Sequence, residues 1–369
     1  MRTTAAVLWE PGGTWEVTDV ELSPPKAGEV LIELAASGLC HSDEHLVTGD
    51  LPAVLPMVGG HEGAGRVAEL GPGVTDLAVG DPVVTTFLPS CGRCPCCARG
   101  LPNLCDDGAG ATLGPQLDGT YRVHAADGTE LGQMCLLGTF ARHTVVPVRS
   151  VVRIDEGFPL ELAALLGCGV TTGFGSAVHT AELRAGDTAV VVGVGGVGAN
   201  AVQGARIAGC RYVVAVDPVE FKRDSARELG ATHVASSVDE AWGIVSELTR
   251  GRMADAAILC TGIAAGADLQ PALQLVGKRG RVVVTALANA TDETASLSLL
   301  DLTLYEKQIR GALFGSASAR YELPRLVEMH NTGQLKLREL VTTEYSLEQI
   351  NTGYEDMRAG RTIRGLIRY

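Results

Sequence analysis

Short apolar runs separated by turn-forming residues make up roughly the first 165 residues of the chain. The clearest runs lie at residues 30–38, 63–74, 81–87 and 143–154. Glycine and proline mark their ends, as at Gly71, Pro72 and Gly73 near the end of the second run. Short Val-rich and Ile-rich runs bounded by such residues are typical of β-strands. This part of the chain is therefore predicted to form an all-β, barrel-like unit.

From about residue 170 the pattern changes to apolar strand, glycine turn and amphipathic helix in alternation. The predicted strands are residues 188–193, 212–217, 255–262 and 280–287, and the first two predicted helices are residues 197–209 and 219–230. Fully apolar strands that alternate with helices indicate a parallel sheet covered on both faces. The second part is predicted to be a doubly wound α/β domain.

The last fifty or so residues contain two predicted helices, at residues 321–333 and 346–360, and a final strand at residues 362–369. Their pattern alone does not assign this segment to either domain.

Composition narrows the class of protein. A chain of 369 residues suits about two domains. No apolar stretch approaches the ~18 residues of a membrane span, and the net charge of −13 without a basic, aromatic window argues against a nucleic-acid-binding surface. The first residues, MRTTAAVLWEPGGTWEV, lack the features of a signal peptide, so a cytoplasmic location is predicted. The partners are expected to be small molecules.

A glycine motif follows the first apolar strand of the second part and opens a helix. It consists of Gly193, Gly195, Gly196, Val197 and Gly198. Such glycines give a tight turn, close approach of the backbone to a pyrophosphate and close packing of helix against strand. Asp217, at the end of the next strand, can accept hydrogen bonds from both ribose hydroxyls and would repel a 2′-phosphate. NAD is therefore predicted as cofactor over NADP, although Lys222 and Arg223 stand near enough to contact a phosphate.

Five of the ten cysteines lie within residues 91–105. A disulfide, a redox-active pair and a metal site are the three alternatives, and a reducing cytoplasm disfavours the first. The spacing of Cys91, Cys94, Cys97 and Cys105 suits one tetrahedral, structural Zn²⁺, and an iron–sulfur cluster is the rival. Cys96 has no place in that spacing.

Three further stretches carry possible ligands: CHSDEH from Cys40, GHEG from Gly60 and GCG from Gly167. With these, the sequence resembles a zinc-dependent alcohol dehydrogenase of the medium-chain dehydrogenase/reductase family. The resemblance runs through GLCHSDEHLVTG, GGHEGAG, GVTDLAVGDPVV, CGRCPCC, GCGVTTGFGSA, GVGGVG and IRGLIRY. The stretches GGHEGAG, CGVTTG and DPVEFKRD are similar to those of bacterial nicotinoprotein alcohol dehydrogenases, which retain NAD between turnovers.

The resemblance implies a catalytic zinc held by Cys40, His61 and Cys168, with the fourth position left for water or substrate. Glu62 matches a carboxylate that can approach this metal, and Asp43 matches the residue that hydrogen-bonds His61. Two zinc ions per chain are expected, one catalytic and one structural.

The resemblance also implies a proton relay from Ser42 through the cofactor ribose to His45 at the surface. Thr172 matches a position packed against the nicotinamide, and Arg364 matches one that contacts the pyrophosphate. Position 41, often arginine in the family and a pyrophosphate contact, is His41, which should hold phosphates less tightly. The apolar substrate pocket implied by analogy is lined by Phe87, Leu51, Leu136 and Leu287.

The expected architecture is a GroES-like β-barrel catalytic domain, residues 1–169 and 316–369, with a Rossmann domain at residues 170–315. The expected activity is hydride transfer between a primary aliphatic or aromatic alcohol and NAD, giving the aldehyde, by a homodimer or homotetramer. The alternatives are a glutathione-dependent formaldehyde dehydrogenase, acting on S-hydroxymethylglutathione, and a non-catalytic NAD-binding protein.

Overall fold

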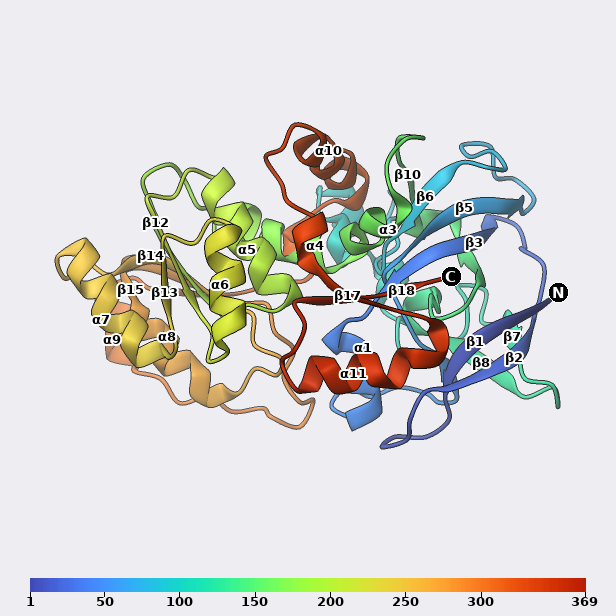
Figure 1. Cartoon of the computed structure of the whole chain (residues 1–369), viewed down its shortest axis with the longest axis horizontal. Coiled ribbons are helices and arrows are strands. Elements are labelled where there is room, and N and C mark those ends of the chain that lie inside the picture. The colour runs from blue at the N-terminus through green and yellow to red at the C-terminus, as the bar shows by residue number, and fades with distance from the viewer. The chain divides into compact units, whose positions relative to one another are not determined.

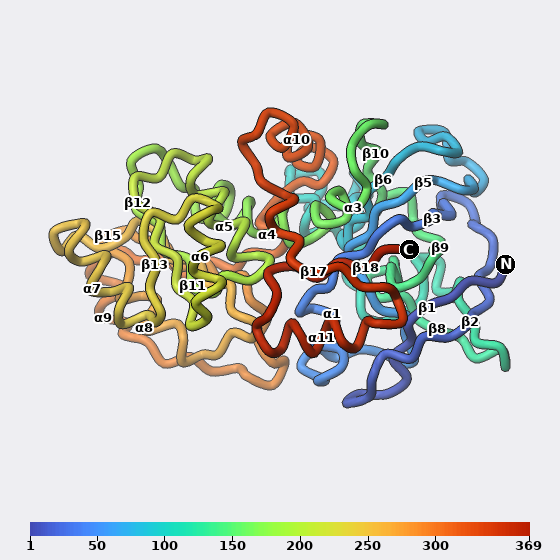
Figure 2. Tube along the Cα trace, viewed as in Figure 1, coloured from blue at the N-terminus to red at the C-terminus, as the bar shows by residue number.

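The computed structural model describes all residues from Met1 to Tyr369. Its contacts divide the chain into two compact units, and Figure 2 traces the path of the chain through them. The first unit contains Met1–Cys168, Ser318–Thr332 and Leu337–Tyr369; the second contains Gly169–Ala317 and Gly333–Lys336. The segment that the sequence pattern left unassigned thus belongs almost wholly to the first unit.

The first unit is built on β-strands. They are β1 (Arg2–Leu8), β2 (Glu16–Leu22), β3 (Glu29–Gly38), β4 (Met57–Val58), β5 (Gly63–Leu70), β6 (Pro82–Thr85), β7 (Val123–His124), β8 (Glu130–Gln133), β9 (His143–Pro147), β10 (Val151–Arg153), β17 (Val341–Tyr345) and β18 (Arg364–Arg368). Strands β1, β2, β7, β8 and β4 close into a barrel. The others form a second sheet in the order β10-β6-β5-β3-β18-β17, with β9 also paired to β3.

Burial on the strands of the first unit follows the apolar positions that predicted them. In β3, Val30, Ile32 and Leu34 belong to one core cluster, because alternate side chains of a strand face the same side. Trp15 and Phe140 meet edge to face in this core, with ring centroids 5.5 Å apart. The helices of this unit are α1 (His41–Thr48), α2 (Pro95–Ala98), α3 (Leu160–Ala163), α10 (Ala319–Asn331) and α11 (Ile350–Arg358).

The second unit has a single parallel sheet in the order β13-β12-β11-β14-β15-β16. Its strands are β11 (Thr188–Val192), β12 (Tyr212–Val216), β13 (His233–Ala235), β14 (Ala254–Leu259), β15 (Val276–Val284) and β16 (Gln308–Gly311). Its helices are α4 (Gly169–Gly175), α5 (Gly196–Ile207), α6 (Glu220–Glu228), α7 (Val238–Thr249), α8 (Leu269–Leu275) and α9 (Leu299–Leu304). Figure 1 shows α5 to α8 arranged around these strands.

This strand order is that of a Rossmann domain, in which the order reverses beside the first strand. All five residues of β11 are buried, as expected for a strand with covered faces. The predicted fold class, a β-barrel unit with a doubly wound parallel-sheet unit, is confirmed. One predicted strand differs: residues 143–154 divide into β9 and β10 around a turn of 3-10 helix at Val148–Ser150.

No single helix is long and apolar enough to cross a membrane. The bent pair Leu160–Gly167 and Gly169–Thr180 meets the length and composition requirement only when its two members are taken together.

Candidate functional site

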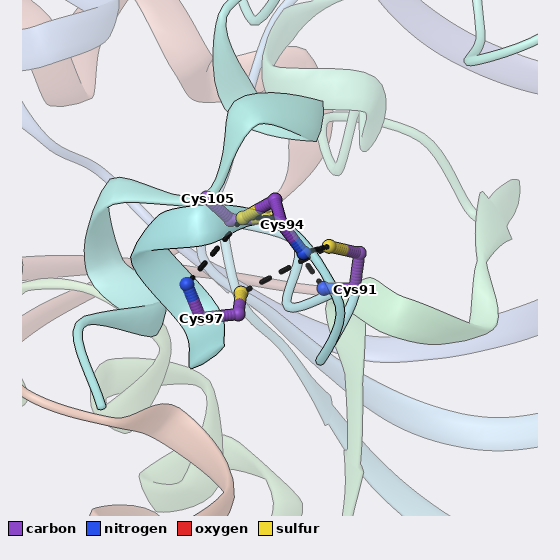
Figure 3. Close-up of side chains that lie close together, drawn as sticks. All are labelled: Cys91, Cys94, Cys97 and Cys105. Atoms are coloured by element: carbon purple, nitrogen blue, oxygen red, sulfur yellow. Dashed lines mark hydrogen bonds between the residues drawn. The ribbon is translucent and has the colours of Figure 1, made fainter. Parts of the chain in front are cut away.

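The loop from Cys91 to Cys105 brings four thiols together (Figure 3). The Sγ atoms of Cys91 and Cys97 are 4.0 Å apart, as are those of Cys94 and Cys105. A disulfide needs about 2.05 Å, whereas a cation about 2.3 Å from four tetrahedral sulfurs puts them about 3.8 Å apart. The loop therefore has the dimensions of a site for one metal ion.

Backbone amides around the same loop point at the sulfurs. The amide of Cys94 donates to Cys91 Sγ at 3.2 Å, and the amide of Cys97 donates to Cys94 Sγ at 3.4 Å from the first turn of α2. The Cys97 amide and other donors lower the pKa of the Cys94 thiol to about 6, because N–H groups stabilise the thiolate. Burial instead raises the pKa of Cys105 to about 12. Zinc bound here would displace the protons that remain on such thiols.

Cys96 does not belong to the four-sulfur group. Its nearest recorded partner is the guanidinium of Arg99, 3.9 Å from its sulfur. All ten cysteines are free of disulfides.

A second group of possible metal ligands is buried in the first unit and consists of Cys40, His61, Glu62 and Cys168. Their ligand atoms all lie within 4.8 Å of one another. Cys40 precedes the first turn of α1, His61 and Glu62 join β4 to β5, and Cys168 follows a 3-10 turn that ends at Gly167. Three segments distant in sequence thus meet at one buried point.

His61 is held in the orientation that a metal ligand needs. Its Nδ1 lies 3.2 Å from Asp43 Oδ1, an oxygen that also accepts from the amide of Gly60 at 2.8 Å. The other ring nitrogen, Nε2, is buried without a hydrogen-bond partner. A buried nitrogen without a partner costs free energy, and a cation bound by the lone pair of Nε2 would remove that cost.

Charges around the cluster are tightly coupled. A hydrogen bond from Cys168 holds the pKa of Cys40 well below its ordinary value despite burial, and the same pair raises the pKa of Cys168. Burial opposes a charged imidazole at His61, but the Asp43 carboxylate and the Cys40 thiolate together raise the pKa of His61 well above its usual range. The cluster therefore holds protons that a divalent cation would replace.

Arg364 enters the same site from β18 and pairs with the carboxylate of Glu62. Both side chains are almost wholly buried. Gly38 makes room for them, because a Cβ there would collide with Glu62 Oε2 and lie 2.8 Å from Arg364 Nη2. The predicted contact of Arg364 with a pyrophosphate stays a prediction; the contact described here is with Glu62.

The predicted relay residues share one helix, α1. Ser42 Oγ lies 3.7 Å from Cys40 Sγ, and His45 follows one helical turn later. The prediction that His45 lies at the surface was wrong, because only 3% of it is exposed. Its side chain is buried, and its Nδ1 contacts Asp50, which the sequence had not indicated as a site residue. His41 is exposed, with its ring centroid 6.3 Å from that of His45.

Of the predicted pocket residues, Phe87 meets the His61 ring edge to face, with centroids 5.7 Å apart. Leu51 and Phe87 are half-buried against the core cluster that contains the β3 side chains, and Leu136 is buried. Leu287 lies in the second unit and is 41% exposed.

Two buried neighbours of the site were missed. Tyr354 reaches from α11 to the Cys40 carbonyl at 3.5 Å, and the Cys135 thiol has its pKa raised to about 11 by burial, next to His61 and Asp43. Cys135 and Leu136 both have positive φ, a backbone conformation that is uncommon outside glycine. No spacing in the sequence marks these positions, because tertiary packing alone brings them near the site.

The glycine motif of the second unit begins directly after β11. Gly193 has φ +88°, and a Cβ there would lie 2.7 Å from the Cys260 carbonyl oxygen. A Cβ on Gly198 would collide with the Gly193 carbonyl, whereas nothing lies within 4 Å of the Cβ position of Gly195. The motif thus has a tight turn, a close helix packing and an open space at the start of α5, where a pyrophosphate fits.

Asp217 supports that loop from the end of β12. Its two oxygens accept from the amides of Val194 at 2.8 Å and Val219 at 2.9 Å, which leaves further lone pairs for ribose hydroxyls. Arg223 donates to the carbonyls of Asp217 and Pro218. Arg223 is therefore committed to this turn.

The remaining cofactor candidates lie in the second unit as well. Lys222 is half-buried on α6, Thr172 is buried in α4 with its carbonyl accepting from Ser176, and Gly196 and Val197 open α5. Their predicted roles toward NAD stay predictions.

Comparison with known proteins identifies the family. Residues 26–156 match the model of the alcohol dehydrogenase GroES-like domain, and residues 196–332 match that of the zinc-binding dehydrogenase. The chain is 51% identical to an NDMA-dependent alcohol dehydrogenase of Amycolatopsis methanolica and 50% identical to alcohol dehydrogenase B of Mycobacterium tuberculosis, each over all of this chain and 99% of the relative. The crystal structure of benzyl alcohol dehydrogenase from Acinetobacter calcoaceticus superposes with a TM-score of 0.93 at 30% identity, over all of this chain and 99% of that one.

These matches cover both units and agree with the two ligand clusters, one of four cysteines and one of Cys40, His61, Glu62 and Cys168. The predicted cofactors, zinc and NAD, are those of this family. Of the two metal sites considered for the cysteine loop, the family supports zinc over an iron–sulfur cluster. The chain belongs to the zinc-dependent alcohol dehydrogenases of the medium-chain dehydrogenase/reductase family.

Proposed function

We propose that the protein oxidises primary alcohols, aliphatic or aromatic, to aldehydes with an NAD that stays bound between turnovers. The single observation that carries the proposal is the buried group Cys40, His61 and Cys168, in which His61 Nε2 has no hydrogen-bond partner. We assign these three residues to the catalytic zinc, and Cys91, Cys94, Cys97 and Cys105 to the structural zinc.

Zinc bound at the buried group supplies Lewis acidity, which lowers the pKa of a substrate hydroxyl. Around it, Asp43 fixes the tautomer of His61 by accepting from Nδ1, so that Nε2 carries a lone pair. Arg364 forms an ion pair with the Glu62 carboxylate, which keeps this fourth member of the cluster in place beside the three ligands. Ser42 and His45 are proposed to carry the alcohol proton away along α1.

The substrate class follows from apolar neighbours. The Phe87 ring packs against His61, and Leu51 and Phe87 pack against the core cluster that contains the β3 side chains. An apolar wall beside a metal favours the hydrocarbon part of an alcohol over a charged substrate. S-hydroxymethylglutathione, which carries carboxylates, would need basic groups there instead.

In the second unit, NAD when bound supplies the hydride acceptor. We propose that the open space at Gly195 takes its pyrophosphate and that Asp217 accepts from its ribose hydroxyls. The NDMA-dependent relative and the nicotinoprotein-like motifs favour retention of this NAD.

We further propose a homo-oligomer in the cytoplasm. Leu299, Leu300 and Leu304 on α9 are 71%, 69% and 67% exposed, and such a group of bare leucines is typical of a surface covered by another protein. The ten free cysteines agree with a reducing compartment.

Release of ligands from denatured protein tests the proposal. We expect about two zinc ions and one NAD per chain, and exchange of hydride between one alcohol and the aldehyde of another without added NAD. Zinc without NAD would leave an ordinary dehydrogenase, and faster turnover of S-hydroxymethylglutathione than of simple alcohols would favour the glutathione-dependent alternative. Failure to turn over any alcohol or aldehyde would leave only a nucleotide-binding role.

A further inference from the structure

A buried histidine and a carboxylate at the edge of the solvent meet at the end of α1. His45 Nδ1 lies 3.3 Å from Asp50 Oδ2, and the side chains are 3% and 13% exposed. An ionised carboxylate can only accept a hydrogen bond, so this contact requires a proton on His45 Nδ1, and in the neutral imidazole Nε2 is then the proton acceptor.

The turn after α1 explains why Asp50 lies there. Gly49 is in the left-handed conformation at φ +76°, and the amide of Leu51 donates to the His45 carbonyl at 3.1 Å. This C-terminal turn brings the chain back across the last turn of the helix. Thr48 Oγ1, 2.5 Å from the same Asp50 oxygen, holds the carboxylate in position.

We infer that Asp50 is a positioning residue for proton release at His45, an inference that rests on the relay assigned to His45 in the proposed function. The carboxylate fixes the tautomer of the imidazole and stabilises the imidazolium formed during alcohol oxidation. Asp50 also extends the route to solvent, which the buried His45 does not reach by itself.

The proton balance is simple. The imidazole would take at Nε2 the one proton that alcohol oxidation releases and that Ser42 passes on. The imidazolium then loses one proton, from Nδ1 through the Asp50 carboxylate to water. Exchange with water restores the Nδ1–H tautomer, so one proton enters and one leaves, and no electrons move in this step.

Other charged groups near His45 are engaged elsewhere or lie farther from it. Glu44 is paired with Arg358 of α11 at 2.7 Å, and the His41 ring is 6.3 Å away. Asp50 is the carboxylate in hydrogen-bond contact with the imidazole.

The first test is ¹⁵N NMR of the His45 imidazole at neutral pH in the full, zinc-loaded protein, with the signals assigned by their absence in His45→Gln. The shifts of Nδ1 and Nε2 report which nitrogen carries the proton. Asp50→Asn is expected to reduce the population with the proton on Nδ1, because the imidazole loses a partner that can only accept. Glu44→Gln, the matched control, removes a neighbouring buried carboxylate and should leave the tautomer unchanged. Asp50→Glu should restore part of the Nδ1–H population.

The second test measures hydride exchange between an alcohol and an aldehyde, in H₂O and in D₂O across pH. Asp50→Asn is expected to slow the exchange about tenfold to a hundredfold near neutral pH and to enlarge the solvent isotope effect. The double variant His45→Gln with Asp50→Asn should be no slower than His45→Gln alone. Zinc content and Tm of each variant exclude misfolding as the cause.

The outcomes separate two failures. If His45→Gln slows exchange while Asp50→Asn changes neither the His45 tautomer nor the isotope effect, the inference about Asp50 is overturned and the relay stands. If His45→Gln itself leaves the rate and pH profile unchanged, the relay in the proposed function is wrong and this inference falls with it.

Discussion

The two clusters of possible metal ligands in the first unit bring their side chains together in opposite ways. The cysteine loop draws all four ligands from residues 91–105, with backbone amides of the same loop donating to the sulfurs. The buried cluster draws Cys40, His61 and Cys168 from three distant segments. The loop therefore depends on local geometry, whereas the buried cluster depends on the folded barrel and its sheets.

The two clusters also differ in their exposure and in the charged groups around them. Three of the four loop cysteines are partly exposed, so the loop site is closed by its own ligands rather than by the protein around it. At the buried cluster, Asp43 and Arg364 bring charges that orient His61 and Glu62. A bracing role suits the first arrangement and a reactive role suits the second.

The largest effect is expected from the buried cluster. His61→Gln removes one ligand but keeps a polar group against Asp43, and it should lower kcat/KM for an alcohol by about a thousandfold or more, which is about 4 kcal/mol of lost stabilisation. Zinc should fall from about two ions per chain to about one, with the Tm nearly unchanged. Retention of both ions would show that His61 is not a ligand.

The loop should respond in the opposite way. Cys105→Ser removes a buried ligand of the structural site and is expected to destabilise the protein by about 3 kcal/mol, which lowers the Tm by about 6–12 °C. Activity per folded, NAD-loaded molecule should stay within about threefold of the parent. Calorimetry and a metal assay on the same sample check both statements. A collapse of activity at unchanged Tm would reverse the roles given to the two clusters.

The same contrast explains what the sequence could predict. The four ligands of the cysteine loop were predictable from spacing, because all of them lie within one turn-rich segment, although spacing left zinc and an iron–sulfur cluster as alternatives. The Rossmann unit was predictable because buried parallel strands leave continuous apolar runs, and the glycines of the motif each have a steric reason. The ligands of the buried cluster could be selected only through resemblance to a family, since no local pattern joins Cys40 to Cys168.

What the sequence could not provide was the burial and pairing of single side chains. His45 was expected at the surface because the family resemblance implied a relay that ends there, yet the turn at Gly49 folds Asp50 against it and packing covers it. Arg364 was assigned to a phosphate, and its ion pair with Glu62 depends on the register of β18 beside β3. Tertiary contacts of this kind have no periodic signal along the chain.

A smaller effect is expected one contact away from the metal ligands. Asp43→Asn keeps an oxygen for the Gly60 amide but removes the charge that supports the His61 tautomer. Zinc affinity of the buried site, or kcat/KM, should fall about tenfold to a hundredfold. Competition with a chelator measures the affinity, and the loop zinc of the same sample is the internal control. Equal weakening of both ions would mean that Asp43 acts on the fold rather than on His61.

The smallest effect is expected at the fifth cysteine of the loop. Cys96 lies outside the four-sulfur group, and its sulfur lies 3.9 Å from the Arg99 guanidinium. Cys96→Ser should therefore keep both zinc ions and change the free energy of unfolding by less than about 0.5 kcal/mol. Cys94→Ser, two residues away in the same short segment, is the matched comparison and should lose the loop zinc. If Cys96→Ser lost an ion and Cys94→Ser did not, the loop would be using a different set of four sulfurs. The loop would still be a site built from one short segment, but its ligands would have to be reassigned before it is compared with the buried cluster.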